Sequence, residues 1–379
     1  MSHRRVVGLF LLAVLIVPLI SPAALGEWDD DNWLTNIIGP ERLEHGDEFG
    51  CHGYEGVKTT DENWVIEACR DYVNDFTEAS RWGGQPISFG IPGDTIDPST
   101  AEELVNSGFE IVGDKLTESP VNLVSMVRNG GSLEKGAFDR AKFESAEEDT
   151  LVSIYWRARV DDLKLREDKD AIEFIENQNV WFTTWGEWHN HGISGQEASE
   201  SVTTDGSLIQ VTLQSREQWN VPGTVKLEFE GNIQRVTDSS GDDILMIDES
   251  EKVLKSGWRI LSDGMLLTIP PGSTITIELD DESNVVSTPL TTFNNLHHAV
   301  TVVGHHTTNL FQWSSDFQES ELRFTWLIER PAEIEMDWRL PVIAITALIA
   351  TPIAIRWIVA RDQQLQSSDE QSDESLVRV

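Results

Sequence analysis

The sequence predicts an α/β domain built as a distorted or incomplete (β/α) barrel, followed by a β-sandwich domain and one C-terminal transmembrane helix. Three observations predict this order. Strand-like and helical runs alternate over residues 27–193, apolar and polar residues alternate over residues 207–335, and an almost unbroken apolar run fills residues 340–360. Alternating strands and helices favour a parallel sheet or barrel, whereas short strands separated by frequent turns favour a sandwich.

Both ends of the chain carry membrane-targeting features. Residues 1–26 combine Arg4 and Arg5 with an apolar stretch and small residues, which is the pattern of a signal peptide; an uncleaved anchor is the alternative. The run 340–360 can cross a hydrocarbon core ~30 Å thick, and a buried core helix is the alternative. The two features together predict a single-pass type I protein of the cell membrane, with an extracellular bulk and a disordered cytoplasmic tail over residues 361–379.

Within the first domain, strands and helices are expected in turn. We expect strands over residues 48–51, 86–90, 109–112, 151–156 and 180–184, and helices over residues 63–77, 97–106 and 168–177. Asp97 or Ser99 can cap the second of these helices. Residues 194–206, rich in Gly, Ser, Glu and Thr, predict a linker.

The second domain is expected to contain strands alone. They are predicted over residues 208–213, 224–230, 265–269, 274–279, 299–303 and 322–328, where apolar and polar residues alternate.

The composition argues against a nucleic-acid partner, and the two cysteines predict one disulfide. The chain has 65 acidic and 28 basic side chains, so it should repel nucleic acid, and we expect no nucleic-acid partner. Its only cysteines are Cys51 and Cys69. Because thiols oxidise outside the cell, a Cys51–Cys69 disulfide is predicted, with free or metal-bound thiols as the alternative.

Several segments of the first domain resemble polysaccharide deacetylases of the NodB-homology family. The segments are GDEFGCHGYEG at 46–56, the stretch 84–114, LVSIYWRARVDDL at 151–163 and NVWFTTWGEW at 179–188. The resemblance covers residues 41–191 in the family's order. It implies a distorted (β/α) barrel that uses a divalent metal to remove acetyl groups from amino sugars.

The family's functional residues carry over only in part. His52 matches the first metal-binding histidine, but Gly56 stands where the second is expected. Gly90 occupies the position of an orienting arginine, and Tyr155 or Trp156 replaces the histidine that protonates the leaving amine. Because a catalytic zinc takes three protein ligands, the sequence predicts a barrel without deacetylase chemistry. A metal-dependent carbohydrate N-deacetylase with an altered ligand set is the alternative.

Two kinds of ligand contact are predicted elsewhere in the first domain. His189 and His191 stand two positions apart and could hold Zn²⁺ with Glu187, with His52 as a third ligand if the barrel brings them together. The chain also has 14 tryptophans, and exposed indoles stack on sugars, although packing in a core is the alternative. The candidates for sugar stacking are Trp82, Trp181, Trp185 and Trp188.

The functional expectation follows from the resemblance and the membrane features. We expect a surface protein that recognises cell-envelope or environmental glycans, or organises the envelope. The deacetylase and a purely structural surface protein are the alternatives. The sequence contains no G-x-S-x-G elbow and no P-loop, so acyl-hydrolase and nucleotide-binding functions have no support.

Overall fold

The chain divides into two compact units, Glu27–Ala332 and a second unit formed by Met1–Gly26 with Glu333–Val379. The computed structural model describes residues 41–54, 59, 64–91, 93–116, 118, 120–133, 138–157, 169–305, 320–330 and 339–376. The predicted signal peptide, residues 1–26, and Gly56 lie outside the described residues.

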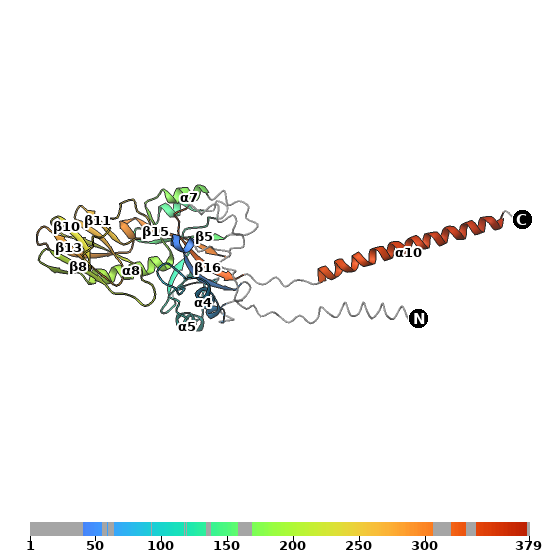
Figure 1. The fold of residues 1–379 in the computed structure, drawn as a ribbon, viewed down its shortest axis with the longest axis horizontal. Coiled ribbons are helices and arrows are strands. Elements are labelled where there is room, and N and C mark those ends of the chain that lie inside the picture. Colours follow the sequence, from blue (N-terminus) through green and yellow to red (C-terminus); the bar gives the residue numbers. More distant parts are fainter. Residues whose placement is uncertain are drawn as a thin grey trace. The chain divides into compact units, whose positions relative to one another are not determined.

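A parallel sheet forms the centre of the unit Glu27–Ala332 (Figure 1). Its eight strands are β1 (Glu48–Tyr54), β2 (Ser88–Ile91), β3 (Ile111–Asp114), β4 (Val124–Val127), β5 (Leu151–Arg157), β6 (Val180–Phe182), β15 (His298–His305) and β16 (Phe324–Arg330). The order is β4-β3-β2-β1-β16-β15-β5, with β6 beside β15, and each of these pairings is parallel.

The two edges of this sheet approach each other. Beyond β4, the backbone of Leu133 donates to the carbonyl of Tyr155 in β5, and the Tyr155 N–H donates to the carbonyl of Gly131, both at 2.9 Å. The sheet is therefore nearly closed, which confirms the predicted parallel, barrel-like arrangement.

Helices follow the strands as the sequence predicts. The predicted helices are α4 (Trp64–Phe76), α5 (Pro98–Asn106) and α7 (Lys169–Glu176); the structure adds α3 (Glu41–His45), α6 (Arg140–Glu144) and α8 (Trp185–Glu200), which were not predicted. The Asp97 side chain accepts a hydrogen bond from the Thr100 N–H and caps α5, as expected. Cys51 on β1 and Cys69 on α4 form the predicted disulfide, which fastens this helix to the sheet.

Alternate residues of the parallel strands face outward and inward. Outward-facing side chains pack into a core, as when Trp156 contacts Phe324 and Trp326 edge to face. On the inner side, the Trp185 indole N–H donates to the Ser153 hydroxyl at 2.9 Å. The first turn of α8 therefore fills the interior of the sheet with a buried indole.

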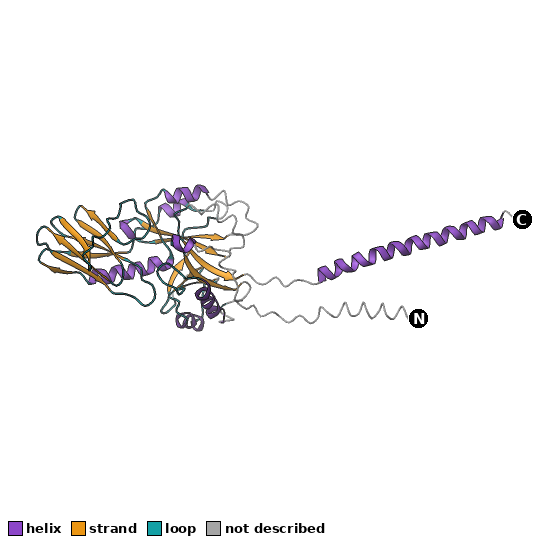
Figure 2. Ribbon diagram, viewed as in Figure 1, coloured by secondary structure: helices purple, strands orange, loops and turns teal. Residues whose placement is uncertain are grey.

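Two antiparallel sheets form a sandwich, shown as the second group of strands in Figure 2. The strands are β7 (Thr203–Asp205), β8 (Leu208–Leu213), β9 (Gly223–Glu228), β10 (Ile233–Asp238), β11 (Gly257–Leu261), β12 (Gly264–Ile269), β13 (Ser273–Leu279) and β14 (Val286–Leu290). Their orders are β10-β13-β8-β7 and β11-β12-β9-β14. Alternate residues such as Ile209, Val211 and Leu213 are buried between the sheets, in line with the period of two.

The predicted linker, residues 194–206, is instead regular structure. Its first seven residues complete α8 and residues 203–205 form β7. A side chain on Gly223 of β9 would overlap the backbone of Ser194 and Gly195 on α8. Gly195 and Gly223 therefore allow the helix to lie directly on the strand, and Gly195 does not mark a flexible connection.

The predicted extent of the sandwich, residues 207–335, also differs from the structure. Strands β15 and β16 were expected there, but both pair in the parallel sheet. The sandwich is therefore an insertion between β6 and β15, and the barrel-like sheet is completed by residues on both sides of it. An apolar run predicts a strand without specifying which sheet it joins, because a strand buried on both faces reads the same in either.

The unit that contains the C-terminus includes α10 (Arg339–Leu376). Within it, Val342–Arg361 has a mean hydropathy of 2.1 and is the one stretch in the described residues that is long and apolar enough to cross a membrane. The helix continues to Leu376, so residues 361–376 are helical where a disordered tail was expected.

Candidate functional site

Charged side chains from distant parts of the chain meet at the carboxyl end of the parallel sheet. His52 lies near the end of β1, Asp114 ends β3, Arg128 directly follows β4, and Glu329 is the penultimate residue of β16. In parallel α/β sheets and barrels this end binds ligands, because the strand ends and the loops that follow them converge there.

Two irregularities of the backbone direct side chains into this cluster. The register between β1 and β16 shifts between Cys51 and Gly53, which places a bulge at His52. Asp114 has a φ of 74°, in the left-handed region that few residues other than glycine adopt. Bulges and left-handed residues re-aim side chains and are concentrated near functional sites.

The cluster is a chain of alternating charges. The His52 Nε2 lies 3.6 Å from the Asp114 Oδ2, and its Nδ1 lies 3.7 Å from the Glu329 Oε1. The other carboxylate oxygen of Asp114 pairs with the Nε of Arg128. The Arg128 guanidinium lies 3.7 Å from the centre of the Tyr155 ring.

Burial and charge act in opposite directions on the imidazole. The side chains of His52 and Asp114 are both only 3% exposed. Burial lowers the pKa of His52, but the carboxylates of Asp114 and Glu329 outweigh it and raise this pKa above its ordinary value of 6.5. The imidazolium form is therefore favoured beside these two carboxylates.

Gly90, at the position where the resembled family has an arginine, makes room for this imidazole. A Cβ atom at Gly90 would overlap the Cδ2 of His52 and lie 2.7 Å from the Leu327 Cδ1. The absence of a side chain in β2 is therefore what allows the His52 ring to lie inside the sheet.

The cluster does not fit the divalent metal that the resemblance implies. Zinc needs at least three donors about 2.0–2.2 Å from one point. Asp114 and Glu329 lie at opposite nitrogens of the His52 ring, so the three side chains do not converge. Among the described residues there is also no other group of three or more His, Cys, Asp or Glu side chains arranged to hold a metal ion.

The predicted zinc ligands His52, His189 and His191 do not come together. His191, on α8, is fully buried against Trp181, with its Nδ1 2.7 Å from the carbonyl of Pro222. Burial lowers the pKa of His191 to about 4.

His189 belongs to the opposite end of the sheet from His52. Its Nε2 lies 3.9 Å from the Oε2 of Glu110, the residue just before β3, and burial lowers its pKa. Because β1 and β3 run in the same direction, the start of β3 lies at the amino end of the sheet and the end of β1 lies at its carboxyl end.

The predicted sugar-stacking tryptophans are mainly core residues. Trp181 and Trp185 are fully buried, which corrects the expectation that they face a glycan. Trp82 and Trp188 are half-buried and pack against the same core. The Trp82 indole N–H donates to the Oε2 of Glu187 at 2.5 Å.

A second charge network lies at the amino end of the sheet. Asp47, immediately before β1, accepts hydrogen bonds from the Arg42 guanidinium at 2.7 and 3.0 Å and from the Trp326 indole at 2.9 Å. Burial acts to raise the pKa of Asp47, but the Arg42 charge and the hydrogen bonds outweigh it and lower this pKa. Asp47 has no exposed surface, so this network is enclosed.

Glu48 extends the amino-end network into the sheet. Its carboxyl group accepts hydrogen bonds from the Ser88 hydroxyl and from the Gly186 N–H at the start of α8, the latter at 2.8 Å. Burial raises the pKa of Glu48, which favours its neutral form.

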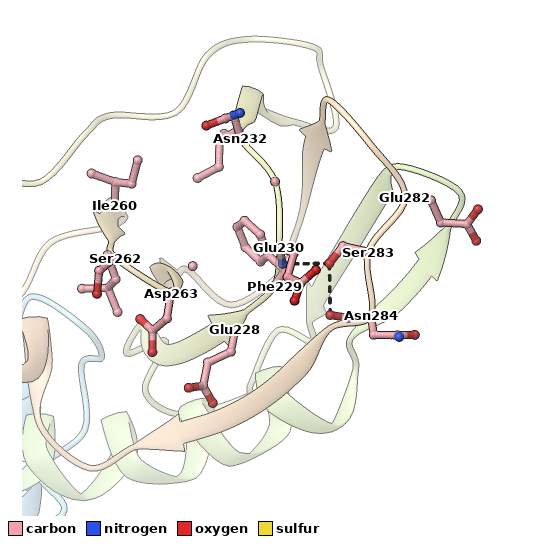
Figure 3. Close-up of a pocket in the computed structure, with 14 residues that line it drawn as sticks. Glu228, Phe229, Glu230, Asn232, Ile260, Ser262, Asp263, Glu282, Ser283 and Asn284 are labelled. Carbon is pink, nitrogen blue, oxygen red and sulfur yellow. Dashed lines mark hydrogen bonds between the residues drawn. The ribbon is translucent and has the colours of Figure 1, made fainter.

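The sandwich carries a hollow of about 930 Å³ at the tips of its hairpins (Figure 3). Four carboxylates line it, from Glu228, Glu230, Asp263 and Glu282. The ammonium of Lys226 pairs with Glu228 and with Asp263. Figure 3 shows the labelled side chains spread around the rim without converging on one point.

Sequence analysis identified His52 but missed Asp114, Arg128 and Glu329. Each of the three ends or directly follows an apolar run, namely 109–113, 124–127 and 322–328. A charged residue at the carboxyl end of a parallel strand is the signal that finds such positions. It was missed for Glu329 because its strand was assigned to the sandwich.

No family model matches the chain, and neither the curated proteins nor the solved structures contain a match to it.

Proposed function

We propose that the protein is a membrane-anchored surface protein that binds a glycan of the envelope or environment at the carboxyl end of its parallel sheet, without metal-dependent deacetylation. The observation that carries the proposal is the cluster of His52, Asp114, Arg128 and Glu329 at that end. Fixed carboxylate, imidazolium and guanidinium groups supply the directional donors and acceptors that a hydroxyl-rich ligand needs.

The geometry favours recognition over deacetylation. Deacetylation in the resembled family needs a metal, and the donors of the cluster point away from a common centre. A structural surface protein with no ligand is the remaining alternative, but it gives no reason for a bulge and a left-handed residue to direct two charged groups toward each other.

A binding experiment on the full-length chain in lipid nanodiscs tests the proposal. Wild type, Glu329→Gln and the matched control Glu278→Gln, which changes an exposed carboxylate of the sandwich, are applied to an array of envelope glycans. We expect binding by wild type and the control, and loss of at least about tenfold in affinity for Glu329→Gln. Absence of binding to any glycan would leave the structural role.

The deacetylase alternative has its own measurement. Zinc-dependent release of acetate from chitin oligomers, absent in His52→Ala, would overturn the non-catalytic function that we propose.

We also propose the type I orientation, with the unit Glu27–Ala332 outside the cell. The support is the signal-like sequence of residues 1–26 and the apolar stretch Val342–Arg361. Protease added to intact cells should degrade the large unit, while an epitope fused after Val379 should become accessible only when the membrane is permeabilised. Access to the epitope in intact cells would contradict this orientation.

A further inference from the structure

We infer that the ligand of the carboxyl-end cluster carries an oxyanion, such as a carboxylate or sulfate, and that Arg128 binds it. This inference rests on the proposed function and adds the chemical class of the ligand. It starts from the charge balance of the chain, in which 65 acidic side chains face 28 basic ones. On such an acidic surface, a cation that reaches solvent at the ligand-binding end of the sheet favours anionic ligands at that position.

The guanidinium of Arg128 is held in one orientation by two contacts. Its Nε pairs with the Oδ1 of Asp114, and its Cζ lies over the Tyr155 ring, 3.7 Å from the ring centre. The backbone N–H of Arg128 also donates to the carbonyl of Asp114 at 3.2 Å. A stacked and paired guanidinium loses little further freedom when it binds a ligand.

The outer part of the guanidinium is available to a ligand. The Arg128 side chain is 20% exposed, whereas that of Asp114 is 3% exposed. Within the described part of the chain, the two Nη groups donate no hydrogen bond. Two parallel N–H groups of this kind match the two oxygens of a carboxylate or sulfate.

The other side chains of the cluster allow an anion to bind beside Arg128. Asp114 is neutralised from both sides, by Arg128 and by the His52 imidazolium, so it does not present an uncompensated negative charge beside the ligand. Glu329 lies at the other nitrogen of the His52 ring. A ligand therefore meets positive charge at the Arg128 end of the cluster and negative charge at the Glu329 end.

Isothermal titration of the full-length chain in nanodiscs tests the inference with two probes that share N-acetylglucosamine. One is neutral chitotetraose and the other is a hyaluronan tetrasaccharide, which adds glucuronate carboxylates. A 6-O-sulfated chitotetraose, which adds sulfate without any carboxylate, distinguishes a site for sulfate from one for carboxylate. We expect wild type to bind at least one acidic probe at least about tenfold more tightly than chitotetraose.

Variants assign the preference to Arg128. Arg128→Gln should lose the preference, so that its affinities for chitotetraose and for the acidic probe lie within about twofold of each other. Arg128→Lys keeps the charge beside Asp114 but removes the fork, and it should show an intermediate loss. Arg235→Gln, which removes an exposed cation of the sandwich, should behave as wild type.

The outcomes separate this inference from the proposed function. Binding of neutral and acidic probes with equal affinity, unchanged in Arg128→Gln, would overturn the inference and leave glycan binding intact. Failure of wild type to bind any of the three probes or any glycan on the array would overturn both.

Discussion

At the amino end of the parallel sheet, Asp47 is held by Arg42 at 2.7 Å and by Trp326 at 2.9 Å. At the carboxyl end, His52 lies 3.6 Å from Asp114 and 3.7 Å from Glu329. The first set of distances is that of strong hydrogen bonds, and the second is that of ion pairs without full hydrogen bonds.

The two ends also differ in their access to solvent. Asp47 and Glu48 have no exposed surface, while the Glu329 and Arg128 side chains are 15% and 20% exposed. A fully enclosed network fixes the start of the strands, whereas one whose outer members, Arg128 and Glu329, reach solvent can also contact a ligand. We therefore expect substitutions at the amino end to act on stability and those at the carboxyl end to act on binding.

The largest effect on stability should come from Asp47→Asn. The change removes the Asp47 charge that pairs with the buried Arg42 guanidinium, and breaking a buried ion pair in this way costs about 3–5 kcal/mol. Denaturant unfolding of the full-length chain, followed by tryptophan fluorescence, measures the loss. The control Asp205→Asn changes an exposed carboxylate of the sandwich and should be neutral.

The same carboxylate should govern the acid side of the stability curve. Because the pKa of Asp47 is lowered in the folded chain, its contribution is present above the ordinary value of 3.8 and is lost as the pH falls through the folded value. An unchanged acid transition in Asp47→Asn would contradict a structural role for the amino end.

The double change Cys51→Ala and Cys69→Ala should cost about 3 kcal/mol, because the disulfide closes a loop between residues 18 positions apart. Cys51 adjoins His52 in sequence, yet its side chain meets α4 outside the sheet. Glycan affinity should therefore stay within about twofold of wild type when measured below the unfolding transition. Loss of binding in a variant that is still folded would show that the two faces of β1 are coupled.

His52→Gln should cost less stability, about 1–2 kcal/mol, because Asp114 keeps Arg128 as a partner and Glu329 is partly exposed to water. The pKa of His52 is raised, so its contribution is present below pH 6.5 and is lost as the pH rises through the folded value. The stability difference between wild type and the variant should shrink over that range.

The control for this variant is His297→Gln, which changes a histidine whose side chain is 44% exposed. Glycan binding should fall at least about tenfold in His52→Gln and remain unchanged in the control. A pH-independent stability difference for His52→Gln would argue against an imidazolium at this site.

Glu48→Gln should have the smallest effect, about 1 kcal/mol or less, because burial already favours the neutral form of this carboxyl group. With a raised pKa, Glu48 contributes stability below its ordinary value of 4.5, and this is lost as the pH rises through the folded value. Denaturant unfolding at several pH values should show that the free energy of unfolding of the variant increases relative to that of wild type as the pH rises. A large loss at neutral pH would mean that the carboxylate form is needed.

Local patterns were enough to predict most elements of the fold. The apolar periods located α4, β5 and the sandwich strands β8, β9, β12 and β13, and Asp97 marked the start of α5. The nearly closed parallel sheet agrees with the predicted class.

Features that depend on distant residues were not predictable in this way. Strands β15 and β16 are short and largely apolar, as the sandwich strands are, and only their neighbours place them in the parallel sheet. For the same reason the sequence pointed to His52 but not to Asp114 or Glu329. These residues become neighbours only where the ends of their strands meet in the fold. Gly195 was assigned to a linker because its close partner, Gly223, lies in another element.

The position of β16 beside β1 has a consequence for the order of folding. The hydrogen bond from Trp326 to Asp47 joins residues 279 positions apart, and the sandwich lies between them as one contiguous stretch. Closing so long a loop carries an entropic cost that local pairings avoid. During synthesis the inserted sandwich can therefore fold first, while β1 must wait, without its central neighbour, until almost the whole chain has emerged.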